Sequence, residues 1–95
     1  MITIQIKKDK ISVHGHAEAG PKGQDIVCAA VSTLTQNLIS SIEELTDDKI
    51  KYSISPGMVD INHEELSEAS KLLVDSFFLG ICSIANEYPA YVKIQ

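Results

Sequence analysis

The segment from Asp25 to Leu45 constrains the fold more than any other stretch of this sequence. Its apolar residues recur every three or four positions, which is the spacing of one face of an α-helix. Asp25 suits the N-cap, where a short acidic side chain accepts hydrogen bonds from the first free backbone N–H groups. We therefore predict a long amphipathic helix over 25–45 whose apolar stripe packs on a sheet, formed by Val27, Val31, Leu34, Leu38, Ile42 and Leu45.

Short alternating segments before this helix predict β-strands. Apolar and polar residues alternate over 2–6, and again over 11–16 after a charged break at 7–10. Such period-two patterns are typical of strands with one buried face. We expect an antiparallel hairpin whose second strand delivers His16 to the following loop.

Two further strand patterns follow the first helix. Ile50, Tyr52 and Ile54 alternate with polar residues, and the pattern resumes at Val59 and Ile61. The intervening residues read Ser-Pro-Gly-Met, which suits a type II turn because proline favours its second position and glycine its third. A tight turn is therefore expected to join these two strands.

A second helix is predicted from about His63 to Glu87. Asn62 is assigned as its N-cap and Glu65 as the capping-box partner, and Tyr88-Pro89 ends it. A last strand is expected over 90–94. The order ββαββαβ predicts an α+β fold, a two-layer domain in which two long helices pack against one sheet.

The second predicted helix is apolar on two sides. Its main stripe consists of Leu66, Leu73, Phe77, Ile81 and Ile84, whereas Leu72 and Leu79 lie on nearly the opposite side, with Phe78 and Cys82 between them. A small domain cannot cover both sides by itself, so we interpret the second side as a homodimer interface. The alternative is a tilted helix that is buried by the chain's own loops.

Length and composition limit the function classes. Ninety-five residues make one domain, 1–95, with no apolar run long enough for a membrane span and no visible signal peptide. Two cysteines without a disulfide framework fit a reducing cytoplasm. A net charge of −5, with all eight basic residues lysine, argues against direct nucleic-acid binding and favours a basic protein partner.

A histidine and a cysteine flank the loop before the first helix. His16 ends the strand pattern, a glycine-containing loop follows, and Cys28 falls in the first turn of the predicted helix. The positive end of a helix dipole and its free amides favour a thiolate and can also form an oxyanion hole. On a helical wheel, Cys28 lies beside the apolar stripe, on the flank that carries Ser32, Thr35 and Ile39, so it can be sheltered and still reachable.

Gly15-His16-Ala17, the glycine-containing loop and the run Asp25-Ile-Val-Cys-Ala-Ala-Val-Ser32 together resemble the signature of the ribosomal-processing cysteine protease family, Prp. The similarity extends over the whole chain in length and order of elements. Members of that family remove an N-terminal extension, after a hydrophobic, aromatic-rich segment, from large-subunit ribosomal protein L-twenty-seven. The resemblance implies a cysteine endopeptidase with a catalytic dyad of Cys28 as nucleophile and His16 as proton donor and general base. It also implies a homodimer, and we expect neither a metal nor a cofactor.

Supporting residues have two interpretations each. Asp25 is most simply a helix cap; the alternative is that it orients His16, and the two roles are compatible. Ser32, one turn after Cys28, either faces outward or takes part in the pocket. Gly20 and Gly23 either permit turn conformations or act as hinges of a loop that opens for substrate and closes over the scissile bond.

Two other function classes are open at this stage. His14, His16 and Cys28 together could bind zinc, because two imidazoles and a thiolate are suitable ligands. A non-catalytic acidic binding or assembly factor for a basic ribosomal protein is the second alternative. Cys82 is expected to be a packing residue, and His63 is expected at the surface at the start of the second helix.

Overall fold

The computed structural model describes residues 1–20 and 25–95, and these residues follow the predicted order of elements. The order ββαββαβ and the α+β class are therefore confirmed. The elements are β1 (Ile2–Ile6), β2 (Lys10–Gly15), α1 (Ile26–Leu45), β3 (Ile50–Ser55), β4 (Met58–His63), α2 (Glu68–Glu87) and β5 (Val92–Ile94).

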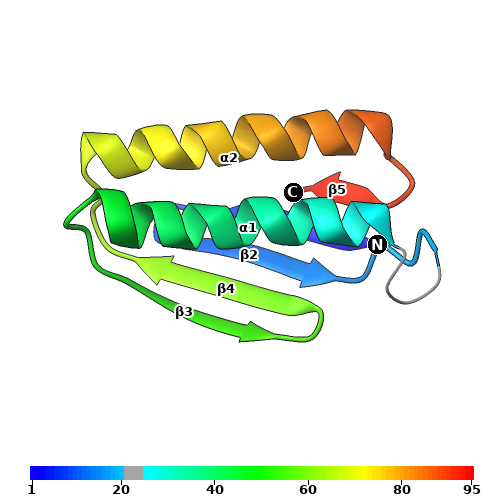
Figure 1. Cartoon of the computed structure of the whole chain (residues 1–95), viewed down its shortest axis with the longest axis horizontal. Helices are drawn as coiled ribbons and strands as arrows, with labels where there is room; N and C mark the ends of the chain where they lie inside the picture. Colours follow the sequence, from blue (N-terminus) through cyan, green and yellow to red (C-terminus); the bar gives the residue numbers. More distant parts are fainter. Residues whose placement is uncertain (21–24) are drawn as a thin grey trace.

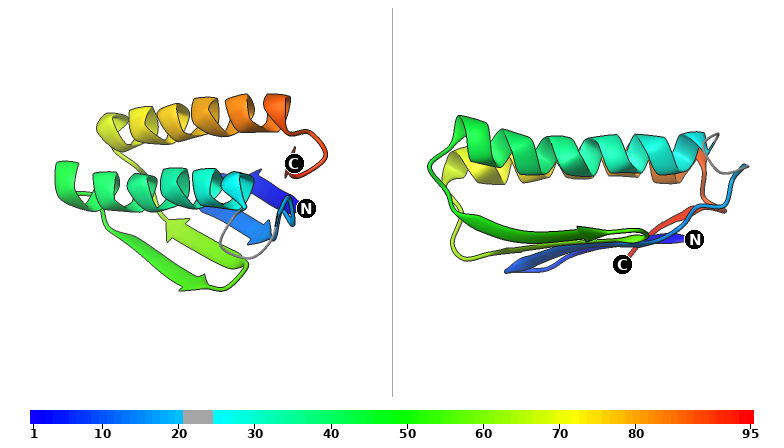
Figure 2. Two further views of the ribbon diagram at one scale, coloured as in Figure 1. Left: turned by 45° about the vertical axis from the view of Figure 1, so that its right-hand side comes forward. Right: turned by 60° about the horizontal axis from the view of Figure 1, so that its bottom comes forward.

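The strands form one sheet in the order β3-β4-β2-β1-β5. Neighbouring strands are antiparallel except β1 and β5, which are parallel because α2 carries the chain back across the sheet. Both helices lie on the same face of the sheet, side by side (Figures 1 and 2). The molecule thus has two layers, as the sequence pattern predicts.

The core lies between the helices and one face of the sheet. Alternation in β1 and β2 directs Ile2, Ile4, Ile11 and Val13 toward the helices, where they are buried. They pack in one cluster with the sheet-facing side of α1 and with part of α2, namely Val27, Val31, Leu38, Ile39, Ile42, Phe77 and Ile81. Burial of this cluster fixes the position of α1 relative to the end of β2, which is where the candidate site forms.

Helix α1 begins as predicted, but its buried face is rotated from the predicted stripe. Thr35 and Ile39 are buried, whereas Leu45 is 73% exposed and Leu34 is half-buried. The hydroxyl of Thr35 donates to the carbonyl of Val31 at 2.7 Å, which satisfies its polar atom within the core. The rotation brings the flank that carries Cys28 toward the sheet.

The predicted start of the second helix is wrong. Asn62 and His63 belong to β4, and α2 begins at Glu68, so Glu65 is outside the helix and not a capping-box partner. Ser67 is the N-cap, and its side chain accepts the N–H of Ser70 at 3.3 Å. The extra ladder hydrogen bonds of β4 and this later cap outweigh the local signal at Asn62.

Two other features of the C-terminal half matter below. The last strand, Val92–Ile94, is shorter than the predicted 90–94. Along α2, Phe77 and Ile81 are buried, while Leu72 (70%), Leu79 (68%) and Phe78 (40%) are exposed. Neither helix in the described part of the chain has the combination of length and apolarity that crossing a membrane requires.

Candidate active site

The start of α1 is held by the carboxylate of Asp25. Its Oδ1 accepts the backbone N–H of Cys28 at 3.0 Å and its Oδ2 accepts that of Ala19 at 3.1 Å. The predicted N-cap is thus confirmed, and the hydrogen bond from Cys28 holds the pKa of Asp25 below its usual value. In the described residues Asp25 caps the helix, and no hydrogen bond joins its carboxylate to the ring of His16.

Cys28 is half-buried in the first turn of α1 and borders two hollows. The first, the hairpin groove, has a volume of about 400 Å³ and lies between α1 and the β3–β4 hairpin. The second, the loop hollow, has a volume of about 500 Å³ and is lined by His16, Glu18, Gly20, Asp25, Cys28, Ala29 and Ser32. Cys28 and Ser32 line both hollows, so the sulfur can be reached from two sides.

His16 directly follows β2 and shares the loop hollow with Cys28. Its imidazole lies against Gly57 in the turn between β3 and β4: a Cβ placed on Gly57 would be 2.5 Å from Nε2 of His16. In the part of the chain that the structure describes, no hydrogen bond joins the His16 ring to the sulfur of Cys28. The two predicted residues therefore meet in one hollow without direct hydrogen bonding.

The loop after His16 contributes to the same hollow. Gly20 lines it, and Glu18, which also lines it, has a left-handed backbone with φ of 57°. A non-glycine residue in that region is uncommon and often marks a functional loop. Gly23, the other predicted hinge, lies outside the described residues.

His14 does not join this group. Its Nε2 lies 2.9 Å from Oδ1 of Asp60, which also accepts the hydroxyl of Ser12 at 3.0 Å. Burial acts to raise the pKa of Asp60, but hydrogen bonds from His14 and Ser12 outweigh it and lower the pKa. Within residues 1–20 and 25–95, no three His, Cys, Asp or Glu side chains are grouped so that they could hold a metal ion, and the zinc interpretation gains no support.

The remaining predicted residues lie apart from the site. Cys82 is half-buried in the middle of α2. His63 is the last residue of β4, where its Nδ1 lies 2.7 Å from the carbonyl oxygen of Glu64. The predicted place of His63 at a helix start is therefore wrong, although the residue is partly exposed.

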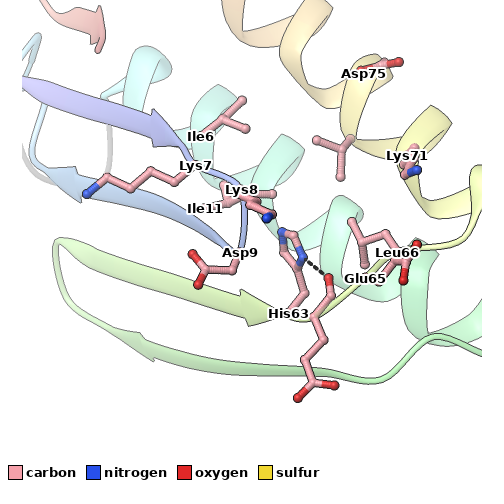
Figure 3. A pocket seen from close by; sticks show the side chains of 12 residues that line it. Ile6, Lys7, Lys8, Asp9, Ile11, His63, Glu65, Leu66, Lys71 and Asp75 are labelled. Atoms are coloured by element: carbon pink, nitrogen blue, oxygen red, sulfur yellow. Dashed lines mark hydrogen bonds between the residues drawn. The ribbon is translucent and has the colours of Figure 1, made fainter.

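A larger hollow of about 810 Å³ lies between the β1–β2 turn and the start of α2 (Figure 3). Apolar side chains such as Ile11 and Val74 line it together with Lys8, Lys71 and Asp75. Neither cysteine is part of its lining. We place the candidate site around Cys28 despite its smaller hollows, because a thiol and an imidazole share one space there and not in the larger hollow.

Comparison with known proteins identifies the family. The family model described as cysteine protease Prp matches residues 1–93. The chain belongs to the cysteine protease Prp family. The ribosomal processing cysteine protease Prp of Mycoplasma genitalium is 32% identical, and the alignment covers 100% of this chain and 95% of that protein. The protein of the same name from Staphylococcus aureus is 28% identical, with 100% and 98% covered.

Solved structures agree with this assignment. The chain matches the crystal structure of SMU.848 from Streptococcus mutans with a TM-score of 0.80 and 33% identity, covering 99% of this chain and 90% of that one. It matches the ribosomal processing protease Prp of S. aureus with a TM-score of 0.92 over 100% and 98% of the two chains, at 23% identity, which shows a shared fold. As a Prp family member, the chain is a cysteine-type peptidase, a hydrolase.

Sequence reasoning missed one residue of the site. The pattern Ser-Pro-Gly-Met predicts the turn at Gly57, and its φ of +72° fits the third position of a type II turn. The pattern gives no signal that this turn contacts His16. That contact depends on the pairing of β2 with β4, two strands separated in sequence by all of α1.

Proposed function

We propose that this chain is the endopeptidase that removes the N-terminal extension of large-subunit ribosomal protein L-twenty-seven, with Cys28 as the nucleophile and His16 as the proton donor and general base. The observation that carries the proposal is that Cys28 and His16 line the same hollow at the start of α1 in a Prp family chain. The S. aureus relative has been crystallised with a covalently linked product peptide and with a substrate peptide, which supports covalent catalysis.

The proposed reaction is acyl transfer. The Cys28 thiolate attacks the scissile carbonyl carbon and forms a tetrahedral intermediate. His16 donates a proton to the leaving amine as the C–N bond breaks, and this leaves a thioester on Cys28. Water then gives a proton to His16 and attacks the thioester, which releases the acid and regenerates the thiolate. The proposal has a dyad without a third member, because no hydrogen bond joins a carboxylate to the His16 ring in the described part of the chain.

Stabilisation of the oxyanion requires hydrogen-bond donors near the sulfur, and free backbone N–H groups are one source of them. The N–H of Cys28 donates to Asp25 and that of Ala29 donates to the carbonyl of Asp25. For the Cys28 N–H to stabilise the oxyanion, substrate binding would have to take it from the carboxylate. The proposal includes this exchange, which would loosen the cap while the tetrahedral intermediate exists.

The hairpin groove suits a hydrophobic peptide. Its lining includes Val13, Val31, Ile54, Met58 and Val59, and Ile54 is 53% exposed on β3, the edge strand of the sheet. Tyr52, on the same side of β3, is 44% exposed and extends the apolar surface. This surface fits the hydrophobic, aromatic-rich segment that precedes the cleavage point in the substrates implied by the family. The charge of −5 favours a basic ribosomal protein, and a cytoplasmic location follows from that substrate.

The exposed side of α2 supports the proposed homodimer. Leu72, Phe78 and Leu79 lie on this side, and none of them is buried by the described residues. Replacing Leu79 with Lys puts a charge into that surface and is expected to shift the protein toward monomer in sedimentation experiments. Leu45→Lys is the control, because Leu45 is equally exposed on α1. Identical sedimentation of Leu79→Lys and the native chain would rule out this interface.

Cleavage is tested with the purified chain and the ribosomal protein of the same host. Intact-mass measurement should show the loss of an N-terminal peptide with the native chain and no loss with Cys28→Ala or His16→Ala. A host protein that lacks the extension, or cleavage by Cys28→Ala, would overturn the proposal. Binding that survives in Cys28→Ala, with no processed fragment from the native chain, would instead indicate the non-catalytic assembly factor.

A further inference from the structure

The turn between β3 and β4 lies beside the end of β2. Gly57 has a φ of +72°, a conformation that glycine adopts without strain. Its carbonyl accepts the backbone N–H of Gly15 at 2.8 Å, and the neighbouring residues Met58 and His14 are paired across β4 and β2. The turn is therefore fastened to the backbone immediately before His16.

The imidazole of His16 occupies the space that a side chain on residue 57 would fill. A Cβ at that position would lie 2.5 Å from Nε2, 3.0 Å from Cε1 and 3.1 Å from Cδ2 of His16. Nε2 and its two neighbours in the ring are therefore the atoms that lie closest to the glycine. Real Cβ atoms do not approach so closely, so any side chain at residue 57 must displace the ring.

We infer that Gly57 is a positioning residue for His16, and that the turn of the β3–β4 hairpin determines where the imidazole rests relative to Cys28. This inference rests on the proposed role of His16 as proton donor and general base. The same turn lines the hairpin groove next to Cys28. One short segment thus contacts the imidazole on one side and the proposed peptide groove on the other.

The effect of crowding follows from the geometry that proton transfer requires. A displacement of about 1 Å in a catalytic group can cost about a hundredfold in rate. Gly57→Ala and Gly57→Asn both add a Cβ, and asparagine tolerates positive φ better than alanine, so it separates crowding from backbone strain. We expect both variants to lower kcat by about tenfold or more, with a smaller change in KM.

The contact itself is testable in the native chain. Nuclear Overhauser effects are expected between the Hα protons of Gly57 and the Hε1 and Hδ2 protons of the His16 ring. Their absence in folded protein would overturn the inference without any variant. In Gly57→Ala and Gly57→Asn, the ring resonances of His16 should shift, while those of His63 should not.

A matched control separates positioning from stability. Ser67→Ala removes the cap of α2, far from the site, and is expected to destabilise the fold while leaving kcat unchanged. Activity that falls in Gly57→Ala only in proportion to the unfolded fraction, as in Ser67→Ala, would overturn the inference. If His16→Ala cleaves normally, the proposed function fails; if His16→Ala is inactive and folded Gly57→Ala keeps its kcat, only the role of Gly57 fails.

Discussion

The two helices begin in nearly the same way but serve different purposes. Each has twenty residues, and in each the N-cap side chain accepts the N–H of the third helical residue: Asp25 from Cys28 in α1, and Ser67 from Ser70 in α2. In α2 that third residue is fully buried, and its hydroxyl donates to Thr46 at 3.2 Å. In α1 it is a half-buried thiol between two hollows.

The first turns also differ in charge. Helix α2 has Glu68 in its first turn, whereas α1 has no acidic residue there. A carboxylate nevertheless lies at the positive end of both helix dipoles, because the N-cap of α1 is itself Asp25. The comparison teaches that a capped helix start becomes a reactive site through the exposure and the neighbours of its third residue, since the cap is common to both.

The largest expected effect is a difference in cleavage activity between variants of Cys28 and Ser70, the third residues of α1 and α2. Cys28→Ala should lower cleavage by at least about a thousandfold because it removes the nucleophile, while circular dichroism shows a folded chain. Ser70→Ala should leave the rate constant unchanged and reduce stability, because it removes a buried hydrogen bond. Comparable loss of activity in both variants, measured at equal folded fraction, would remove the distinction.

The next prediction concerns the reactivity of the two thiols. Iodoacetamide at neutral pH should label Cys28 at least about tenfold faster than Cys82, because only Cys28 lies at a helix N-terminus and beside open hollows. Peptide mapping by mass spectrometry measures both rates, and the unfolded chain gives the reference in which both react alike. Equally slow labelling of both sulfurs in native protein, even with substrate peptide present, would contradict the enzymatic interpretation.

A smaller effect is expected from the caps. Ser67→Ala should lower the free energy of unfolding by about 1 kcal/mol and leave cleavage per folded molecule unchanged. Asp25→Ala should lower both stability and kcat, because it also releases the N–H groups of Cys28 and Ala19. Urea unfolding combined with kinetics tests this pair. Full activity of folded Asp25→Ala would show that the cap does not hold the thiol in its reactive position.

The smallest effect is a dependence of stability on pH. The pKa of Asp25 is lowered from its ordinary value of 3.8 by the hydrogen bond from Cys28, so the unfolded chain binds more protons than the folded one in acid. The stability from this group is present above the ordinary value and is lost as the pH falls through the lowered value. Urea midpoints measured from pH 7 down to about pH 3 should fall less steeply in Asp25→Asn than in Asp47→Asn, an exposed control.

Local signals in the sequence were sufficient for the start of α1 but not for the start of α2. Asp25 stands alone between a loop and a regular apolar stripe, so its role as a cap can be read from the chain. Asn62 gives a similar local signal, but its backbone pairs with Lys10 on β2 and Lys51 on β3, and those partners come from distant segments. Pairing with distant strands therefore places Asn62 in a strand and not at a helix cap. The periodicity of the sequence gives no information about that pairing.

The features of the site also fall into those that the sequence predicts and those that depend on tertiary structure. The positions of His16 and Cys28 on either side of a loop, and the helix start at Cys28, follow from sequence. The contact of His16 with Gly57 and the two hollows around Cys28 depend on the strand order β3-β4-β2. The exposure of Leu45 was missed for a related reason, since the buried side of α1 is set by where the sheet lies beneath it.

Cys28 and Ser32 line both the hairpin groove and the loop hollow and therefore lie at the border between them. An extended ligand that crosses this border contacts apolar strand residues such as Ile54 in the hairpin groove. In the loop hollow it contacts His16 and Glu18. One part of such a ligand therefore contacts apolar side chains, and the other part contacts polar ones. Inhibitor design can therefore start from two sets of small fragments, one that binds the hairpin groove and one that binds the loop hollow. Two such fragments can be joined beside Cys28 and attached covalently to its sulfur.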